Sequence, residues 1–158
     1  MPALAYHLTW TTYGTWLPGD ARGWVKWGEG GVKPPDPERE HEARERMVES
    51  AVVLSEDQRA IVEQIIRDHC RLRGWLLHAV NARSHHVHVV VTADRDPNEV
   101  MNQLKAWCSR ELSNAAGLVG RVAKKAGQRR WFTEGGDKEL FDTEEYLANA
   151  ITYVLERQ

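Results

Sequence analysis

The segment from Ser84 to Val91 constrains the fold of this chain more than any other, because it alternates histidine with valine. Valine favours β-strands, and successive side chains of a strand point to opposite faces. His86 and His88 therefore share one face, where their imidazoles are close enough to bind one metal ion, while Val87 and Val89 point into a core. The alternative is a half-exposed strand on which both histidines are ordinary surface residues.

Capping signals place two helices around this segment. Ser55 and Gln58 fit a capping box, Gly74 ends that helix, and Asp96-Pro97 opens a second helix. The expected order is a strand at 4–13, an irregular insertion at about 14–54, a helix to residue 74, strands at 75–81 and 85–93, a helix to about 117, short strands flanking Gly135-Gly136, and a last helix capped by Asp142 or Thr143. Without the insertion and the last helix this order is βαββαβ. It predicts an α+β, ferredoxin-like antiparallel sheet with helices on one face.

Length and composition predict a single domain spanning residues 1–158. No apolar run approaches the roughly 20 residues that span a bilayer, and the start of the chain lacks a signal-peptide pattern. The two cysteines, Cys70 and Cys108, fall in expected helices and predict free thiols in a reducing cytoplasm. Within the insertion, we expect Trp16, Trp24 and Trp27 to pack against the loop and residues 38–50 to form a charged helix.

A basic run precedes the short strands, although the formal net charge of the chain is −2. Such a run, ending in aromatic residues, could hold a nucleic-acid backbone and stack a base. A solvated surface loop is the other interpretation. The residues concerned are Arg121, Lys124, Lys125, Arg129 and Arg130, with Trp131 as the candidate for stacking.

The last helix presents two stripes. The stripe that should face the sheet follows helical spacing and consists of Leu147, Ile151 and either Val154 or Leu155. Tyr146, Asn149 and Tyr153 share a neighbouring stripe. A tyrosine in this place is ordinarily a packing residue, but a phenolic oxygen can also attack a phosphate and form a covalent phosphotyrosine.

The other histidines show no spacing comparable to that of the pair on the strand. His85 faces away from its neighbours and is not expected to be a ligand. The remaining ones are expected to be hydrogen-bonded or exposed, namely His7, His41, His69 and His78.

Five segments resemble the single-tyrosine HUH transposases of the IS200/IS605-like group, which includes the enzymes associated with repetitive extragenic palindromes (REP). Residues 6–10 and 13–20 resemble the first strand and signature loop of one subgroup, and residues 86–88 match the HUH motif. Residues 135–140 resemble the glycine-rich turn before the final helix, and residues 153–158 resemble the closing tyrosine motif.

The resemblance implies a ferredoxin-like fold, a divalent metal (Mg²⁺ or Mn²⁺) and cleavage of single-stranded DNA at hairpin-flanked ends. The tyrosine becomes joined to the 5′ phosphate, a 3′ hydroxyl is released, and a second exchange rejoins strands. It further implies a nucleoid-associated protein of the bacterial cytoplasm. Members of the transposon branch are homodimers with active sites shared between subunits, and others are monomers.

Carried over by position, His86 and His88 become metal ligands and Tyr153 the nucleophile, with Tyr146 as the alternative. The family often has a polar amide four residues after the tyrosine as third ligand. That position is Arg157 here, which cannot bind a cation. The substitutes are Gln158 and Asn149.

Two other functions stay open at this point. A non-catalytic, DNA-binding relative would keep the fold without turnover, in line with Arg157 and the acidic charge balance. A histidine-triad nucleotide hydrolase would need a third alternate histidine. The neighbouring positions are Ser84 and Val90, so this function is remote.

Overall fold

A four-stranded antiparallel sheet forms the centre of the molecule, in a computed structural model that describes residues 3–26, 28–117 and 130–156. The strands are β1 (Ala5–Thr11), β2 (Leu76–Ala82), β3 (His86–Thr92) and β4 (Asp137–Phe141), in the spatial order β2-β3-β1-β4. This order is the one expected for a ferredoxin-like fold, and the predicted α+β class is confirmed.

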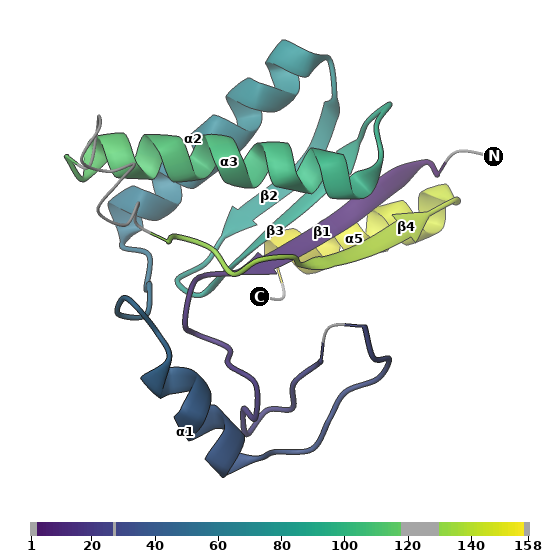
Figure 1. Cartoon of the computed structure of the whole chain (residues 1–158). Coiled ribbons are helices and arrows are strands. Elements are labelled where there is room, and N and C mark those ends of the chain that lie inside the picture. Colours follow the sequence, from purple (N-terminus) through teal and green to yellow (C-terminus); the bar gives the residue numbers. More distant parts are fainter. Residues whose placement is uncertain (1–2, 27, 118–129, 157–158) are drawn as a thin grey trace.

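Two long helices cover one face of the sheet (Figure 1). Helix α2 (Glu56–Arg73) begins with the predicted capping box of Ser55 and Gln58 and ends at Gly74 in the left-handed conformation. Helix α3 (Pro97–Ala115) begins at Asp96, whose side chain accepts a hydrogen bond from the Asn98 amide. The core beneath these helices contains the alternate β3 side chains Val87, Val89 and Val91.

The C-terminal helix α5 (Glu144–Glu156) lies on the opposite face (Figure 1). Ala150 and Val154 are buried there against Ala79, Val90 and Phe141, with Leu147 and Ile151 partly buried at the edge of the same cluster. The predicted sheet-facing stripe is therefore confirmed. Because β3 alternates, this face also receives His86 and His88.

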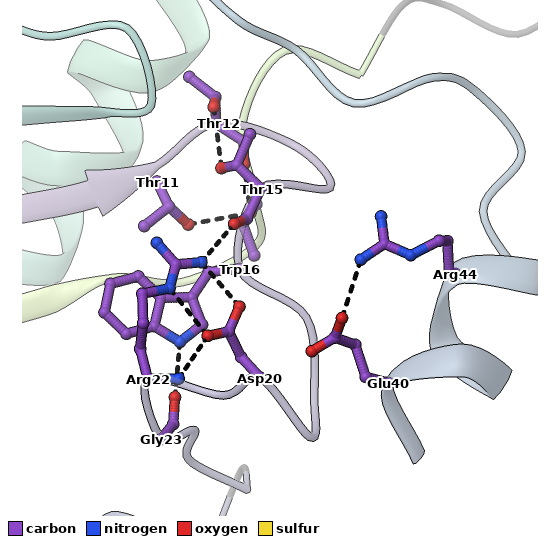
Figure 2. Close-up of polar contacts among 10 residues, drawn as sticks. Thr11, Thr12, Thr15, Trp16, Asp20, Arg22, Gly23, Glu40 and Arg44 are labelled. Atoms are coloured by element: carbon purple, nitrogen blue, oxygen red, sulfur yellow. Dashed lines mark hydrogen bonds and ion pairs between the residues drawn. The ribbon is translucent and has the colours of Figure 1, made fainter. Parts of the chain in front are cut away.

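The insertion between β1 and α2 extends beyond one end of the sheet and carries the short helix α1 (Pro37–Glu45) (Figure 1). Trp24 is buried as predicted, and its indole N–H donates to the Pro34 carbonyl. Trp16 stays 43% exposed, but it also contacts the loop, through a hydrogen bond to the Gly23 carbonyl and the Arg22 guanidinium over its ring (Figure 2). Trp27 lies outside the described residues.

Helix α1 is polar on every side and buries no residue. It ends at Glu45, and Met47 to Ala51 form bends and loop. The charged helix is therefore shorter than predicted. Its stability comes from local pairs such as Glu40 with Arg44 (Figure 2). Among the described residues, no helix is long and apolar enough to cross a membrane.

Candidate active site

The register between β1 and β3 brings polar side chains of both strands onto the face that α5 covers. Thr9 is the strand partner of His88, and Thr11 is the partner of His86. His7 lies two residues before Thr9, so its side chain points to the same face. His7 Nε2 is 3.0 Å from His88 Nδ1, and Thr9 Oγ1 is 3.2 Å from the same His88 atom.

An open pocket of about 770 Å³ lies between this face and α5. The sheet contributes histidines from β1 and β3 and carboxylates from β4, and α5 contributes its second stripe. The polar and aromatic residues that line the pocket include His7, Thr9, His88, Asp137, Glu139, Tyr146, Asn149 and Tyr153. The predicted stripe of Tyr146, Asn149 and Tyr153 therefore faces one cavity.

His88 is buried, and its surroundings keep it neutral. Burial is the main cause that lowers the pKa of His88 to about 3, with the nearby His86, His7 and Arg83 acting in the same direction. Burial also lowers the pKa of His7, against the opposing effect of Glu139 and Asp137. Both rings are neutral at physiological pH, so each has a nitrogen lone pair for a metal ion or a hydrogen bond.

The contacts around His88 favour one arrangement of its protons. Glu139 lies 3.8 Å from His7 Nδ1, so that nitrogen is the better place for the His7 proton. His7 Nε2 then accepts from His88 Nδ1–H, which leaves Nε2 of His88 with its lone pair. A carboxylate or other acceptor behind a histidine commonly fixes a metal ligand in this way.

Tyr153 stands beside the histidines of its own chain. Its ring centre is 6.0 Å from that of His88 and 6.2 Å from that of His7. Tyr153 is 46% exposed, so its ring borders both the histidines and the open pocket. Tyr146 lines the same pocket at 59% exposure, without a ring contact to either histidine among the described residues.

His86 and His88 suit a shared divalent metal. Their ring centres are 4.8 Å apart, and two imidazoles bound to one ion through bonds of about 2.1 Å place their centres on the order of 5 Å apart. The described residues hold no cluster of three or more histidine, cysteine or acidic side chains arranged for a metal. Side-chain amides, water and substrate oxygens are further ligand types for such an ion. Asn149 borders the pocket, whereas Gln158 lies outside the described residues.

His7 is the site residue that the sequence prediction missed. It was expected to be an unrelated histidine, yet it contacts His88 directly. The sequence feature that could have identified it is the alternation of polar residues at His7, Thr9 and Thr11 on β1. The same alternation occurs at His86 and His88 on β3. The other three histidines fit the expectation: His41 pairs with Glu45, His69 with Gln103 and His78 with Thr92.

Most of the basic run, with Arg121, Lys124, Lys125 and Arg129, lies outside the described residues. Arg130 is exposed, and its backbone N–H donates to Glu49. Trp131 is 5% exposed, and its indole N–H donates to Ser113 in the core under α3. In this conformation the Trp131 ring lies inside the core, so it is not placed to stack a base as predicted.

The sheet, the paired histidines and the tyrosine helix define a class of proteins that combine a ferredoxin-like fold with a candidate metal and nucleophile site. Residues 46–149 match the family model described as "Transposase IS200 like". The chain therefore belongs to the IS200-like transposase family, whose members act in DNA transposition. The matched segment contains His86 and His88 and ends before Tyr153.

Two solved structures share the fold. One is a protein of Deinococcus radiodurans R1 solved as a candidate transposase, with a TM-score of 0.53 and 17% identity over 100% of this chain and 93% of the other. The second is a REP-associated tyrosine transposase bound to a REP hairpin, with a TM-score of 0.53 and 11% identity, covering 98% of this chain and 66% of that one. No curated protein sequence matches the chain.

Proposed function

We propose that this chain is a metal-dependent endonuclease and strand transferase for single-stranded DNA, with Tyr153 as its nucleophile. The observation that carries the proposal is the position of Tyr153, whose ring lies 6.0 Å from that of His88 across an open pocket of the same chain. A phenol beside a candidate metal pair is the arrangement that phosphoryl transfer to tyrosine requires.

The chemistry is an exchange of one phosphodiester for another. The Tyr153 oxygen forms a bond to phosphorus, and the bond between phosphorus and the 3′ oxygen of the preceding nucleotide breaks. The phenol loses its proton, and the leaving oxygen gains one to become a 3′ hydroxyl. The product is a 5′-phosphotyrosine that a second 3′ hydroxyl can attack in reverse, which rejoins two strands without an external energy source.

His86 and His88 are the proposed metal ligands, with Asn149 or Gln158 as further candidates. The ion would be Mg²⁺ or Mn²⁺, and when bound it would act as a Lewis acid on the scissile phosphate. Imidazole ligands favour transition metals over magnesium, so Mn²⁺ is the first ion to test. The neutral state of His88 at physiological pH is what such a site requires.

The proposed substrate is a single strand next to a DNA hairpin. Support comes from the structural relative that was solved with a REP hairpin. The open pocket offers space for an unpaired nucleotide, and RNA and DNA single strands are commonly read through such unpaired bases next to folded shapes. The residues proposed to hold the DNA backbone are Arg121, Lys124, Lys125, Arg129 and Arg130.

A denaturing gel with labelled single-stranded hairpin DNA from the regions flanking the gene tests the proposal. We expect a slow, protease-sensitive band that needs Mn²⁺, disappears in Tyr153→Phe and weakens strongly in His86→Ala. Tyr146→Phe is the matched control, because Tyr146 borders the same pocket on the same helix. Binding without an adduct on any flanking hairpin would favour a non-catalytic DNA-binding relative. A band that persists in Tyr153→Phe and is lost in Tyr146→Phe would move the nucleophile to Tyr146.

A further inference from the structure

Asn81 links the histidine strand to the tyrosine helix. It lies on β2 as the direct strand partner of His88, and both side chains point to the face that α5 covers. The Asn81 side-chain amide donates a hydrogen bond of 2.8 Å to the backbone carbonyl of Val154. Val154 follows Tyr153 in the chain, so a single hydrogen bond connects the partner of His88 to the residue after Tyr153.

The acceptor of this bond belongs to the last turn of α5. The final four carbonyls of a helix have no partner within the helix, and Val154 is among them because α5 ends at Glu156. The Val154 side chain is fully buried against the sheet. The turn that carries Tyr153 is thus fixed twice, by an apolar contact of the Val154 side chain and by a polar contact of its backbone.

We propose that Asn81 is a positioning residue that holds the Tyr153 turn against His88, so that each chain carries a complete site of its own. This inference rests on the proposed function and adds that the tyrosine acts in cis rather than on a second subunit. To act on another subunit, α5 would have to leave its own sheet. That movement would break the contacts of α5 with the apolar cluster around Val90 and Phe141 of its own chain, and the Asn81 bond within the chain.

Two substitutions of Asn81 test the positioning role. Asn81→Ala removes the amide, and Asn81→Asp keeps its size while replacing the N–H donor by a carboxylate that faces a carbonyl. The added charge of aspartate would attract a nearby cation, so a slower rate of adduct formation in this variant cannot come from weaker metal binding. Leu155→Ala is the control, because Leu155 lies in the same turn and is exposed.

We expect both Asn81 variants to form the adduct about 10- to 100-fold more slowly under single-turnover conditions, since misplacement by about 1 Å has effects of this size. The Kd for hairpin DNA should stay within about twofold of the wild type. Amide hydrogen exchange should accelerate at the end of α5 alone. An unchanged rate of adduct formation in both variants would overturn the proposal. A slower rate that is fully explained by weaker DNA binding or by unfolding of the whole protein would overturn it as well.

Mixing two impaired variants tests the cis arrangement with chains that keep Asn81. Tyr153→Phe lacks the nucleophile, and His86→Ala lacks a histidine. We expect the mixture to form no more adduct than its His86→Ala chains form alone, because no chain then holds a complete site. Recovery of about a quarter of the wild-type adduct is the share expected when random exchange makes half of the dimers mixed, each with one complete site. Such recovery would show a site shared between subunits and overturn the proposal, even if the Asn81 variants failed to fold.

The two proposals can fail separately. If the wild-type protein forms no adduct with any hairpin, the proposed function fails. Hydrogen exchange in the Asn81 variants still decides whether Asn81 holds the end of α5. If the wild type is active and the mixture recovers activity, only the cis arrangement fails.

Discussion

His7 is the residue whose importance is seen only in three dimensions. Its sequence neighbours do not mark it as functional, but strand pairing places it against His88 with Glu139 behind it. Thr9 adds a second contact to the same His88 nitrogen. The pair of histidines on β3 could be predicted from alternation alone, whereas the groups that orient them depend on the register with β1, which the sequence does not reveal.

Replacing His7 should weaken metal binding. His7→Ala removes the acceptor that fixes the His88 proton on Nδ1, and losses of about 10-fold in metal affinity are typical for such supporting groups. Calorimetric titration with Mn²⁺ in the absence of DNA measures this. His78→Ala serves as the control, since His78 bonds to Thr92 away from the pocket. Equal Mn²⁺ affinity in His7→Ala and the wild type would show that His7 does not orient His88.

Asp20 should make the insertion sensitive to acid. Its carboxylate accepts hydrogen bonds from the Arg22 side chain and backbone, which lower its pKa to about 2 (Figure 2). The folded pKa lies below the unfolded value, so the contribution to stability is complete above about pH 4 and is lost as the pH falls towards 2. Because Arg22 is half-exposed, the contribution is at most about 1 kcal/mol.

Urea unfolding of the wild type and Asp20→Asn at a series of pH values isolates this contribution. We expect the wild type to be the more stable protein at pH 7 and the difference to shrink steadily below pH 4. A difference that does not change with pH would show that the carboxylate charge has no role there.

At the scale of elements, local sequence signals predicted the helix ends well. The pairing of strands that are distant in sequence could hardly be predicted. The ends of α2 and α3 were predicted from Ser55, Gly74 and Asp96, because capping depends on a few neighbouring residues. Of the short strands predicted on either side of Gly135-Gly136, the one at residues 131–133 is reduced to the isolated bridge between Thr12 and Phe132. The one at residues 140–141 is part of β4 (Asp137–Phe141). Its place is set by the pairing with β1.

The turn before β4 depends on Gly136. A Cβ at this position would lie 2.6 Å from Met101 Sδ and 2.7 Å from the Thr9 carbonyl oxygen. Gly136→Ala should therefore push β4 away from β1 and α3 and lower the free energy of unfolding by about 1–3 kcal/mol. Denaturant unfolding measures the loss.

Gly135→Ala is the matched control for Gly136→Ala. Gly135 has a φ of +80°, and a Cβ at this position would meet no atom of the described residues within 4 Å, so this variant reports backbone strain without the clash. In addition, Gly136→Ala should slow adduct formation, because the added Cβ would press on the backbone of Thr9, whose side chain contacts His88. Gly135→Ala should not slow it. Wild-type stability in Gly136→Ala would contradict the close packing described.

At the scale of the whole molecule, the two faces of one sheet have separate tasks. Alternation along β3 sends Val87, Val89 and Val91 to the core under α2 and α3, and His86 and His88 to the face of α5. The α2 and α3 face stabilises the sheet, and the α5 face assembles the pocket. Alternation and helical spacing predicted both faces. They could not predict that β1 and β4 also contribute to the pocket.

Identification of the residue that carries the DNA is the most direct test of the central claim. The covalent adduct formed with Mn²⁺ and a short hairpin oligonucleotide is digested with nuclease and protease, and the nucleotide-bearing peptide is sequenced by mass spectrometry. We expect a 5′-phosphonucleotide on Tyr153, beside His88. A modification on Tyr146, or on any other residue, would contradict it.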